Sequence, residues 1–271
     1  MIEETVAYIQ SKIGILKPDI GLILGSGLAE VAGSITNPIV IPYKDIPDFP
    51  QSSVAGHKSQ LTIGQIGQHT VVCLQGRFHL YEGHPPQVIN TVIKVLKKLG
   101  IKELIVTNAS GSLNPDFAPG SIMIIADHIN FSGLNPLIGV NDDQYGPRFP
   151  SLTYAYSVDL RKKMKRIALE SGIQIHEGIY LMVLGPNFET PAEIRTFHAI
   201  GADAVGMSTV PEVICAVRCG MKVLGLSVIT NYGAGMVPNA TSHDETLEQG
   251  NKACTQLSYL IQKYLEDTID G

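Results

Sequence analysis

The chain has 271 residues, of which 44% are hydrophobic, and a formal net charge of −5. This size and apolar content suit one large α/β domain over residues 1–271, and the acidic balance argues against binding to nucleic acid or to an anionic membrane surface. The first residues are acidic where a signal peptide needs a basic region, and no apolar run reaches the length of a membrane span, so we expect a cytoplasmic protein without membrane partners.

Short apolar runs alternate with helical segments along the chain. The runs predicted to be strands are residues 20–24, 61–63, 70–74, 104–107, 122–126, 179–184, 202–205 and 223–229. The segments predicted to be helices are residues 86–99, 158–170, 191–199, 211–219 and 243–265. Short, continuously apolar strands are typical of the interior of a parallel or mixed sheet. The expected fold is an α/β sandwich with a central mixed β-sheet flanked by helices.

Two further features bound the possible function. Residues 130–156 form an irregular stretch too long for an ordinary connection, so they are a candidate binding loop or subunit contact. The four cysteines lack metal-ligand spacing, which predicts reduced, buried thiols and no metal site. Cys215 and Cys219, one helical turn apart, are the pair to check for a bond.

A run of polar side chains follows residues 70–74. If the chain remains extended there, Arg77, His79 and Tyr81 share one face because strand side chains alternate. The planar guanidinium fits a phosphate, and Glu82 could orient His79. The alternative is the polar outer face of a half-buried edge strand.

Other polar segments also follow predicted strands: residues 25–27, 108–112 and 230–231. Ligands of α/β sheets bind beyond strand ends, so these segments are expected to converge on one pocket. The first of them is a weak dinucleotide motif because Glu30 stands where Gly or Ala is needed. It fits a phosphate-binding turn and a plain strand-to-helix turn about equally.

An aromatic side chain and a carboxylate later in the chain indicate a second kind of site, one for a heteroaromatic ring. Phe188 offers a stacking face and Glu189 two acceptors, which suits a heteroaromatic ring with N–H donors. Glu189 could instead be an acid at a helix N-terminus, Asn231 a turn residue, and Ser208 a helix N-cap. Ser26, Ser110 and Ser208 lie outside a Gly-x-Ser-x-Gly elbow, so a serine nucleophile is not expected.

Taken together, these segments resemble the trimeric, 6-oxopurine-preferring purine nucleoside phosphorylase family, which also includes methylthioadenosine and xanthosine phosphorylases. The matching pieces are residues 24–28, 56–57, 75–83, 106–109, 185–190, 205–212 and 229–231. Three pieces depart from the pattern. Ser110 and Ser112 stand where the family often has Ala and Gly, Tyr232 and residues 233–236 differ from the mammalian-type loop, and Asn187 is similar to the xanthosine-accepting subgroup.

The resemblance implies a nucleoside phosphorylase fold and a set of site residues. Phosphate would be held by Ser26, His57, Arg77, His79, the backbone N–H of Ala109, and Ser208. The ribose would be contacted by Tyr81, Met207 and His243. The base would be held by Phe188, Glu189, Thr230 and Asn231. His79, Glu189 and Asn231 would carry catalysis, and Phe149 would enter the neighbouring subunit's site, which implies a homotrimer.

The implied reaction is reversible phosphorolysis of inosine, guanosine and similar (deoxy)ribonucleosides to free base and α-pentose 1-phosphate, as in purine salvage. Phosphate is then a co-substrate, and neither a metal nor an organic cofactor is implied. The alternatives are a methylthioadenosine phosphorylase, a nucleoside hydrolase and a non-catalytic nucleoside-binding protein.

Overall fold

A computed structural model describes residues 2–25, 27–28, 30–52, 58–237 and 243–268, and of residues 243–249 it describes the backbone alone. Within these ranges the strands are β1 (Ile20–Ile23), β2 (Thr36–Pro42), β3 (Gln60–Ile66), β4 (His69–Gln75), β5 (Glu103–Ser112), β6 (Ile122–Asn130), β7 (His176–Met182), β8 (Ala204–Gly206) and β9 (Lys222–Tyr232). The helices are α1 (Ile2–Ile13), α2 (Glu30–Gly33), α3 (Pro86–Leu99), α4 (Val158–Glu170), α5 (Pro191–Ala199), α6 (Val210–Arg218) and α7 (His243–Glu266), with 3-10 turns at Tyr43–Asp45, Leu80–Glu82 and Asp143–Tyr145.

These strands form one mixed sheet in the order β2-β3-β4-β1-β5-β8-β7-β6-β9. Strand β9 also pairs in parallel with β5, so β5, β8, β7, β6 and β9 close into a ring. The predicted α/β fold with a central mixed sheet is confirmed. Ring closure could not be predicted, because the pairing of β5 with β9 joins segments more than a hundred residues apart.

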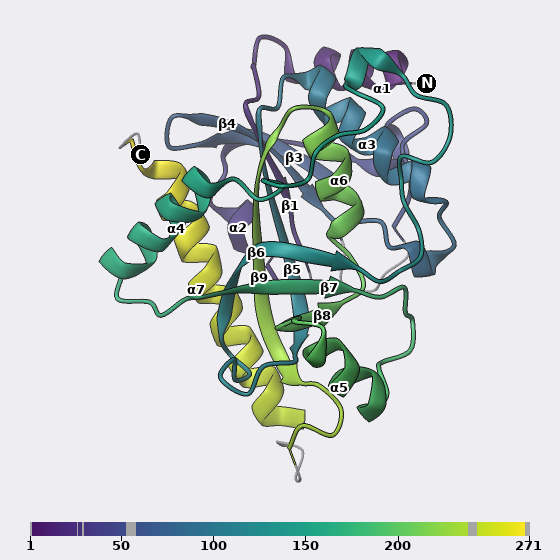
Figure 1. The fold of residues 1–271 in the computed structure, drawn as a ribbon. Helices are drawn as coiled ribbons and strands as arrows, with labels where there is room; N and C mark the ends of the chain where they lie inside the picture. The colour runs from purple at the N-terminus through teal and green to yellow at the C-terminus, as the bar shows by residue number, and fades with distance from the viewer. Residues whose placement is uncertain (1, 26, 29, 53–57, 238–242, 269–271) are drawn as a thin grey trace.

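Helices cover both faces of the sheet, with α4 and α7 together on one side and α1, α3 and α6 on the other (Figure 1). Strand β5 shows why two layers form. Leu104 and Val106 pack in the core beneath α1, α3 and α6, while Ile105 packs in the core beneath α4 and α7. Successive strand side chains point to opposite faces, so a continuously apolar strand supports both layers.

Local sequence sets one end of each of two helices. Helix α5 begins with a capping box in which the Thr190 hydroxyl accepts from the Glu193 N–H and the Glu193 carboxylate accepts from the Thr190 N–H. Helix α3 ends at Gly100, whose φ of 107° lies in the region that glycine tolerates best.

The sequence prediction was wrong about where β5 and β9 end. Residues 108–112 and 230–231 were expected to follow strands, but β5 continues to Ser112 and β9 to Tyr232. The two strands pair in parallel over these polar stretches, with a register shift between Ser110 and Gly111. Their backbone groups are therefore satisfied by each other, which lets polar side chains stand on strands next to a cavity.

No helix in the described part of the chain is long and apolar enough to cross a membrane. All four cysteines are buried and free, so Cys215 and Cys219 form no bond.

Candidate active site

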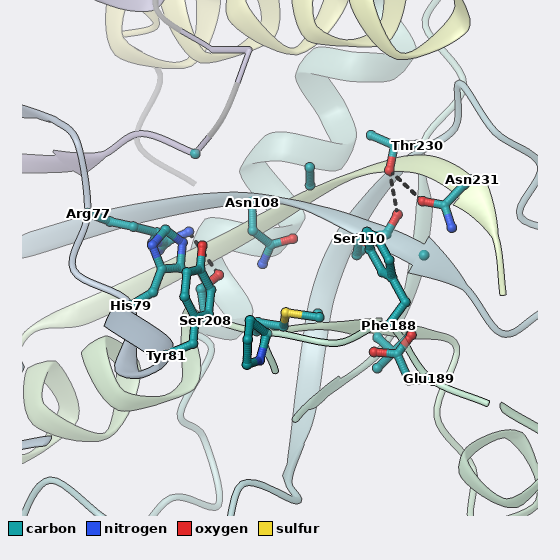
Figure 2. A pocket seen from close by; sticks show the side chains of 17 residues that line it. Arg77, His79, Tyr81, Asn108, Ser110, Phe188, Glu189, Ser208, Thr230 and Asn231 are labelled. Atoms are coloured by element: carbon teal, nitrogen blue, oxygen red, sulfur yellow. Dashed lines mark hydrogen bonds between the residues drawn. The ribbon is translucent and has the colours of Figure 1, made fainter. Parts of the chain in front are cut away.

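A cavity of about 470 Å³ lies where the ends of β4, β5, β8 and β9 meet the loop that follows β7. Its lining brings together the following predicted site residues: Arg77, His79, Tyr81, Ala109, Phe188, Glu189, Met207, Ser208, Thr230 and Asn231. Figure 2 shows Arg77, His79, Tyr81 and Ser208 gathered at one end and Phe188, Glu189, Thr230 and Asn231 at the other. We call these the anion end and the ring end.

The anion end is organised by the buried guanidinium of Arg77, which is 2% exposed. Its Nε donates to Glu212 Oε1 (3.1 Å), and its Nη1 donates to the Thr107 carbonyl (2.6 Å) and to Ser208 Oγ (3.1 Å). Glu212, on the first turn of α6, is 4% exposed, so this ion pair is shielded from solvent. A buried ion pair of this kind holds the planar guanidinium in one orientation far better than a solvent-exposed pair would.

Ser208 is held by an unusual turn at the start of α6. Thr209 is the helix N-cap, with φ 75° and ψ −50°, and the Val210 N–H donates to the Ser208 carbonyl at 2.8 Å. This is the geometry of a γ-turn, which a residue with a branched side chain adopts only where its surroundings enforce it. The alternative in which Ser208 is the helix N-cap is wrong, and Ser208 lines the cavity instead.

A chain of buried hydrogen bonds supports Thr209 from below. Ser227 Oγ donates to Asn108 Oδ1 (2.6 Å), and Asn108 Nδ2 donates to Thr209 Oγ1 (2.8 Å). Because the Ser227 hydrogen is used in this way, Ser110 donates to Ser227 Oγ across 2.6 Å. Every donated hydrogen in this series of hydrogen bonds therefore points toward Thr209. The Thr209 hydroxyl lies 3.2 Å from Ser208 Oγ and can donate to it. The Ser208 hydrogen is then available to an anion in the cavity.

His79 and Tyr81 reach the cavity by a route that the sequence did not predict. Strand β4 ends at Gln75 and residues 80–82 form a 3-10 turn, so the expected extended strand through Tyr81 is wrong. The predicted partnership of His79 with Glu82 is confirmed: Nδ1 lies 3.2 Å from Oε1, and the His79 N–H donates to the same oxygen at 2.8 Å. The rings of His79 and Tyr81 stack with centroids 4.6 Å apart. Burial, and then the Glu82 charge, raise the pKa of Tyr81.

The ring end is more open. Phe188 is 82% exposed, and Glu189 beside it is partly buried, which raises the pKa of its carboxyl; the Glu193 charge adds to the shift. Thr190 and Glu193 cap α5, and Glu189 lies just before the N-cap, so the acid within the first turn of that helix is Glu193. Asn231 is a strand residue of β9, so its alternative reading as a turn residue is wrong.

Four predicted site residues are not placed at the cavity. Ser26 and His57 lie outside the described residues, and so does the side chain of His243 at the start of α7. Phe149 lies in the long connection between β6 and α4 and is 89% exposed.

Sequence reasoning missed the buried residues that support Arg77 and Ser208 by hydrogen bonds, chiefly Glu212, Thr209 and Ser227. A signal for Glu212 was present, since it is an acid in the first turn of a helix segment that is otherwise apolar up to Arg218. Nothing in the local sequence indicated Ser227, because its role depends on the register that pairs it with Asn108 across β9 and β5. No group of His, Cys, Asp and Glu side chains suited to a metal ion occurs among the described residues.

Comparison with known proteins agrees with this geometry. The family model described as the phosphorylase superfamily matches residues 19–266. Purine nucleoside phosphorylase 1 of Bacillus subtilis is 49% identical over 251 residues, covering 93% of this chain and 92% of the relative. The purine nucleoside phosphorylase of Bos taurus is 44% identical over 255 residues, covering 90% and 87%. The solved structure of Schistosoma mansoni purine nucleoside phosphorylase with inosine superposes with a TM-score of 0.92 at 39% identity, covering 100% of this chain and 97% of that one.

Proposed function

The chain belongs to the phosphorylase superfamily, within its purine nucleoside phosphorylases, and from this premise we propose that it catalyses the reversible phosphorolysis of 6-oxopurine ribonucleosides and deoxyribonucleosides. Phosphate attacks the anomeric carbon, and the products are the free purine and α-pentose 1-phosphate. The observation that carries this proposal is that one cavity has anion-type donors at one end and nucleobase-type groups at the other.

The proposed roles follow from position. Phosphate is held at the anion end by Arg77, Ser208, His79 and the backbone N–H of Ala109, with Ser26 and His57 added from outside the described residues. Tyr81, Met207 and His243 contact the ribose that bridges the two ends. The purine lies against Phe188, with its N–H groups donating to Glu189 and with Thr230 and Asn231 at its other edge.

Catalysis in this arrangement needs no covalent enzyme intermediate. As the glycosidic bond lengthens, the sugar becomes cationic beside the bound phosphate, while negative charge on the departing purine is met by the Asn231 amide. Each charge-assisted hydrogen bond of this kind contributes about 1.5–3 kcal/mol. Phosphate serves as co-substrate, and no further cofactor enters the proposed reaction.

We propose that the enzyme acts as a homotrimer in which Phe149 completes a neighbour's site. Exposed apolar side chains crowd the segment between β6 and α4, namely Phe131, Leu134, Ile138, Val140, Phe149 and Tyr154. Such a concentration marks a contact surface. A cytoplasmic location is proposed because buried free thiols suit a reducing compartment.

The test is cleavage of inosine by the purified protein with and without inorganic phosphate. The proposal expects hypoxanthine and ribose 1-phosphate to appear only when phosphate is present. Equal cleavage without phosphate would make the chain a hydrolase, and no cleavage under either condition would make it a binding protein. Preference for methylthioadenosine over inosine would assign it to the other phosphorylase.

A further inference from the structure

The amide of Asn231 has a fixed direction, and two neighbours set it. Asn231 Nδ2 donates to the Tyr232 carbonyl at 3.0 Å, while Asn231 Oδ1 lies 2.9 Å from Thr230 Oγ1. A carbonyl oxygen can only accept, so the amide nitrogen, and not the amide oxygen, must face Tyr232. The oxygen is then left facing Thr230, whose hydroxyl supplies the donor. Figure 2 shows the Asn231 oxygen turned to Thr230 and the nitrogen turned away from it.

The Thr230 side chain is itself held in place. Its methyl group faces α7, where a Cβ added at Gly250 would lie 3.7 Å from Cγ2. Its hydroxyl lies on the side of β5, 3.2 Å from the Ser110 carbonyl as well as 2.9 Å from Asn231 Oδ1. The hydroxyl has one hydrogen, and the shorter contact is with Asn231.

Gly111 leaves space beside the amide nitrogen of Asn231. A Cβ at Gly111 would lie 3.3 Å from Asn231 Nδ2, tighter than most contacts of a Cβ. Both Gly111 and Asn231 line the cavity. One hydrogen of the amide nitrogen is used by Tyr232, which leaves the second as a donor for a ligand at the ring end.

We propose that Thr230 is a specificity-determining positioning residue, because it locks Asn231 with its N–H group, and not its oxygen, toward the base. This inference rests on the proposed function and deepens it. A purine with a 6-oxo acceptor meets a donor in this arrangement, whereas a 6-amino purine places a donor against a donor. Discrimination between the two classes therefore depends on a hydroxyl that does not contact the distinguishing atom.

The experiment compares kcat/KM for inosine and adenosine, with phosphate saturating, in wild type, three variants of Thr230 and one control variant. Thr230→Val keeps the shape and removes the hydroxyl, Thr230→Ser keeps the hydroxyl, and Thr230→Ala serves if the valine variant folds poorly. Thr107→Val is the matched control. It also loses a buried hydroxyl, one that accepts at 2.8 Å from the N–H of Gly25, a residue of the cavity lining.

The inosine-to-adenosine ratio is expected to fall about threefold to tenfold in Thr230→Val and Thr230→Ala, the equivalent of one hydrogen bond, and to stay near wild type in Thr230→Ser and Thr107→Val. An unchanged ratio in both hydroxyl-free variants would overturn the inference even if their rates fell. Failure of wild type to cleave inosine with phosphate would overturn the proposed function instead, so the two failures are distinguishable.

Discussion

The anion end and the ring end of the cavity are built in opposite ways. At the anion end, Arg77 is 2% exposed and tied to Glu212, Thr107 and Ser208, and buried hydrogen bonds hold Ser208 from behind. At the ring end, Phe188 is 82% exposed on a loop, and one strand supplies the amide that faces it. One chain is thus sufficient to preorganise the anion end, whereas the ring end is left open to solvent.

This difference has an energetic consequence. Groups at the anion end contribute to folding and to ligand binding at once, because they are buried and mutually paired. Groups at the ring end contribute mainly to binding, because little of the fold rests on them. Substitutions should separate the two ends by their effect on stability.

The largest expected effect is at the buried ion pair. Glu212→Gln leaves the Arg77 charge unpaired in the core and should lower the free energy of unfolding by about 3–5 kcal/mol, measured by urea denaturation. Phosphate should stabilise the variant more than it stabilises wild type because it supplies the missing negative charge, whereas hypoxanthine should stabilise the two proteins equally.

Glu170→Gln is the matched control for that variant. It breaks the exposed pair with Arg166 (3.2 Å) and should cost less than about 1 kcal/mol. Equal losses in the two variants would show that the Arg77 pair has no special role in the anion end.

At the ring end, Glu189→Ala should leave the unfolding curve close to wild type and lower kcat/KM for inosine by about a hundredfold, because one or two charge-assisted hydrogen bonds to the base are lost. Steady-state kinetics beside a thermal melt would check both parts. A variant with near-normal kcat/KM would remove Glu189 from base binding, and a large drop in melting temperature would contradict the contrast between the two ends.

A smaller effect is expected from Ser227→Ala, which takes the donor from the buried Asn108 Oδ1 (2.6 Å). The free energy of unfolding should fall by about 1–3 kcal/mol, and KM for phosphate should rise because the support of Thr209 and Ser208 is loosened. Ser11→Ala removes an exposed hydroxyl on α1 that donates to the Tyr8 carbonyl at 2.7 Å, and this control should change neither quantity. If KM for phosphate stays constant while stability falls, the buried series of hydrogen bonds contributes only to the stability of the fold.

The smallest expected effect is a shift in pH dependence. Burial raises the pKa of Glu189 above its ordinary value of 4.5, so the carboxylate takes up a proton at a higher pH than a solvent-exposed glutamate would. On the acid side, kcat/KM for inosine should fall with a midpoint above 4.5, and this limb should be absent from the residual activity of Glu189→Gln.

The same shift fixes the sign of the stability effect. A pKa that is higher in the folded than in the unfolded state stabilises the fold below the unfolded pKa, and that contribution is lost as pH rises through the folded pKa. Glu189→Gln should therefore melt slightly above wild type at neutral pH. A lower melting temperature would contradict the assigned cause of the shift.

Helices with strong local signals could be predicted from the sequence alone. The bounds predicted for α3, α4 and α5 agree with the structure at both ends, because first-turn prolines, an apolar stripe or a terminal glycine mark them. Helix α1 was missed although Val6, Ile9 and Ile13 have helical spacing and are buried. Strand β2 was missed because it is a mostly exposed edge strand that contains two prolines.

The site was predictable in its residue types and much less so in its support. Arg77, Glu189 and Asn231 could be singled out because their chemistry is unusual where they stand. The pairing of Glu212 with Arg77 spans 135 positions, and the contact of Ser227 with Asn108 spans 119, so neither could be found from local patterns. These contacts depend on tertiary structure, which fixes the sheet register and the docking of α6.

The most direct test is a crystal structure of the protein with hypoxanthine and ribose 1-phosphate bound together. The account predicts the phosphate beside Arg77 and Ser208, the base against Phe188 within hydrogen-bonding distance of Glu189 and Asn231, and the sugar's anomeric carbon between them. A phosphate group bound away from Arg77 and Ser208, or a base outside the cavity, would contradict it.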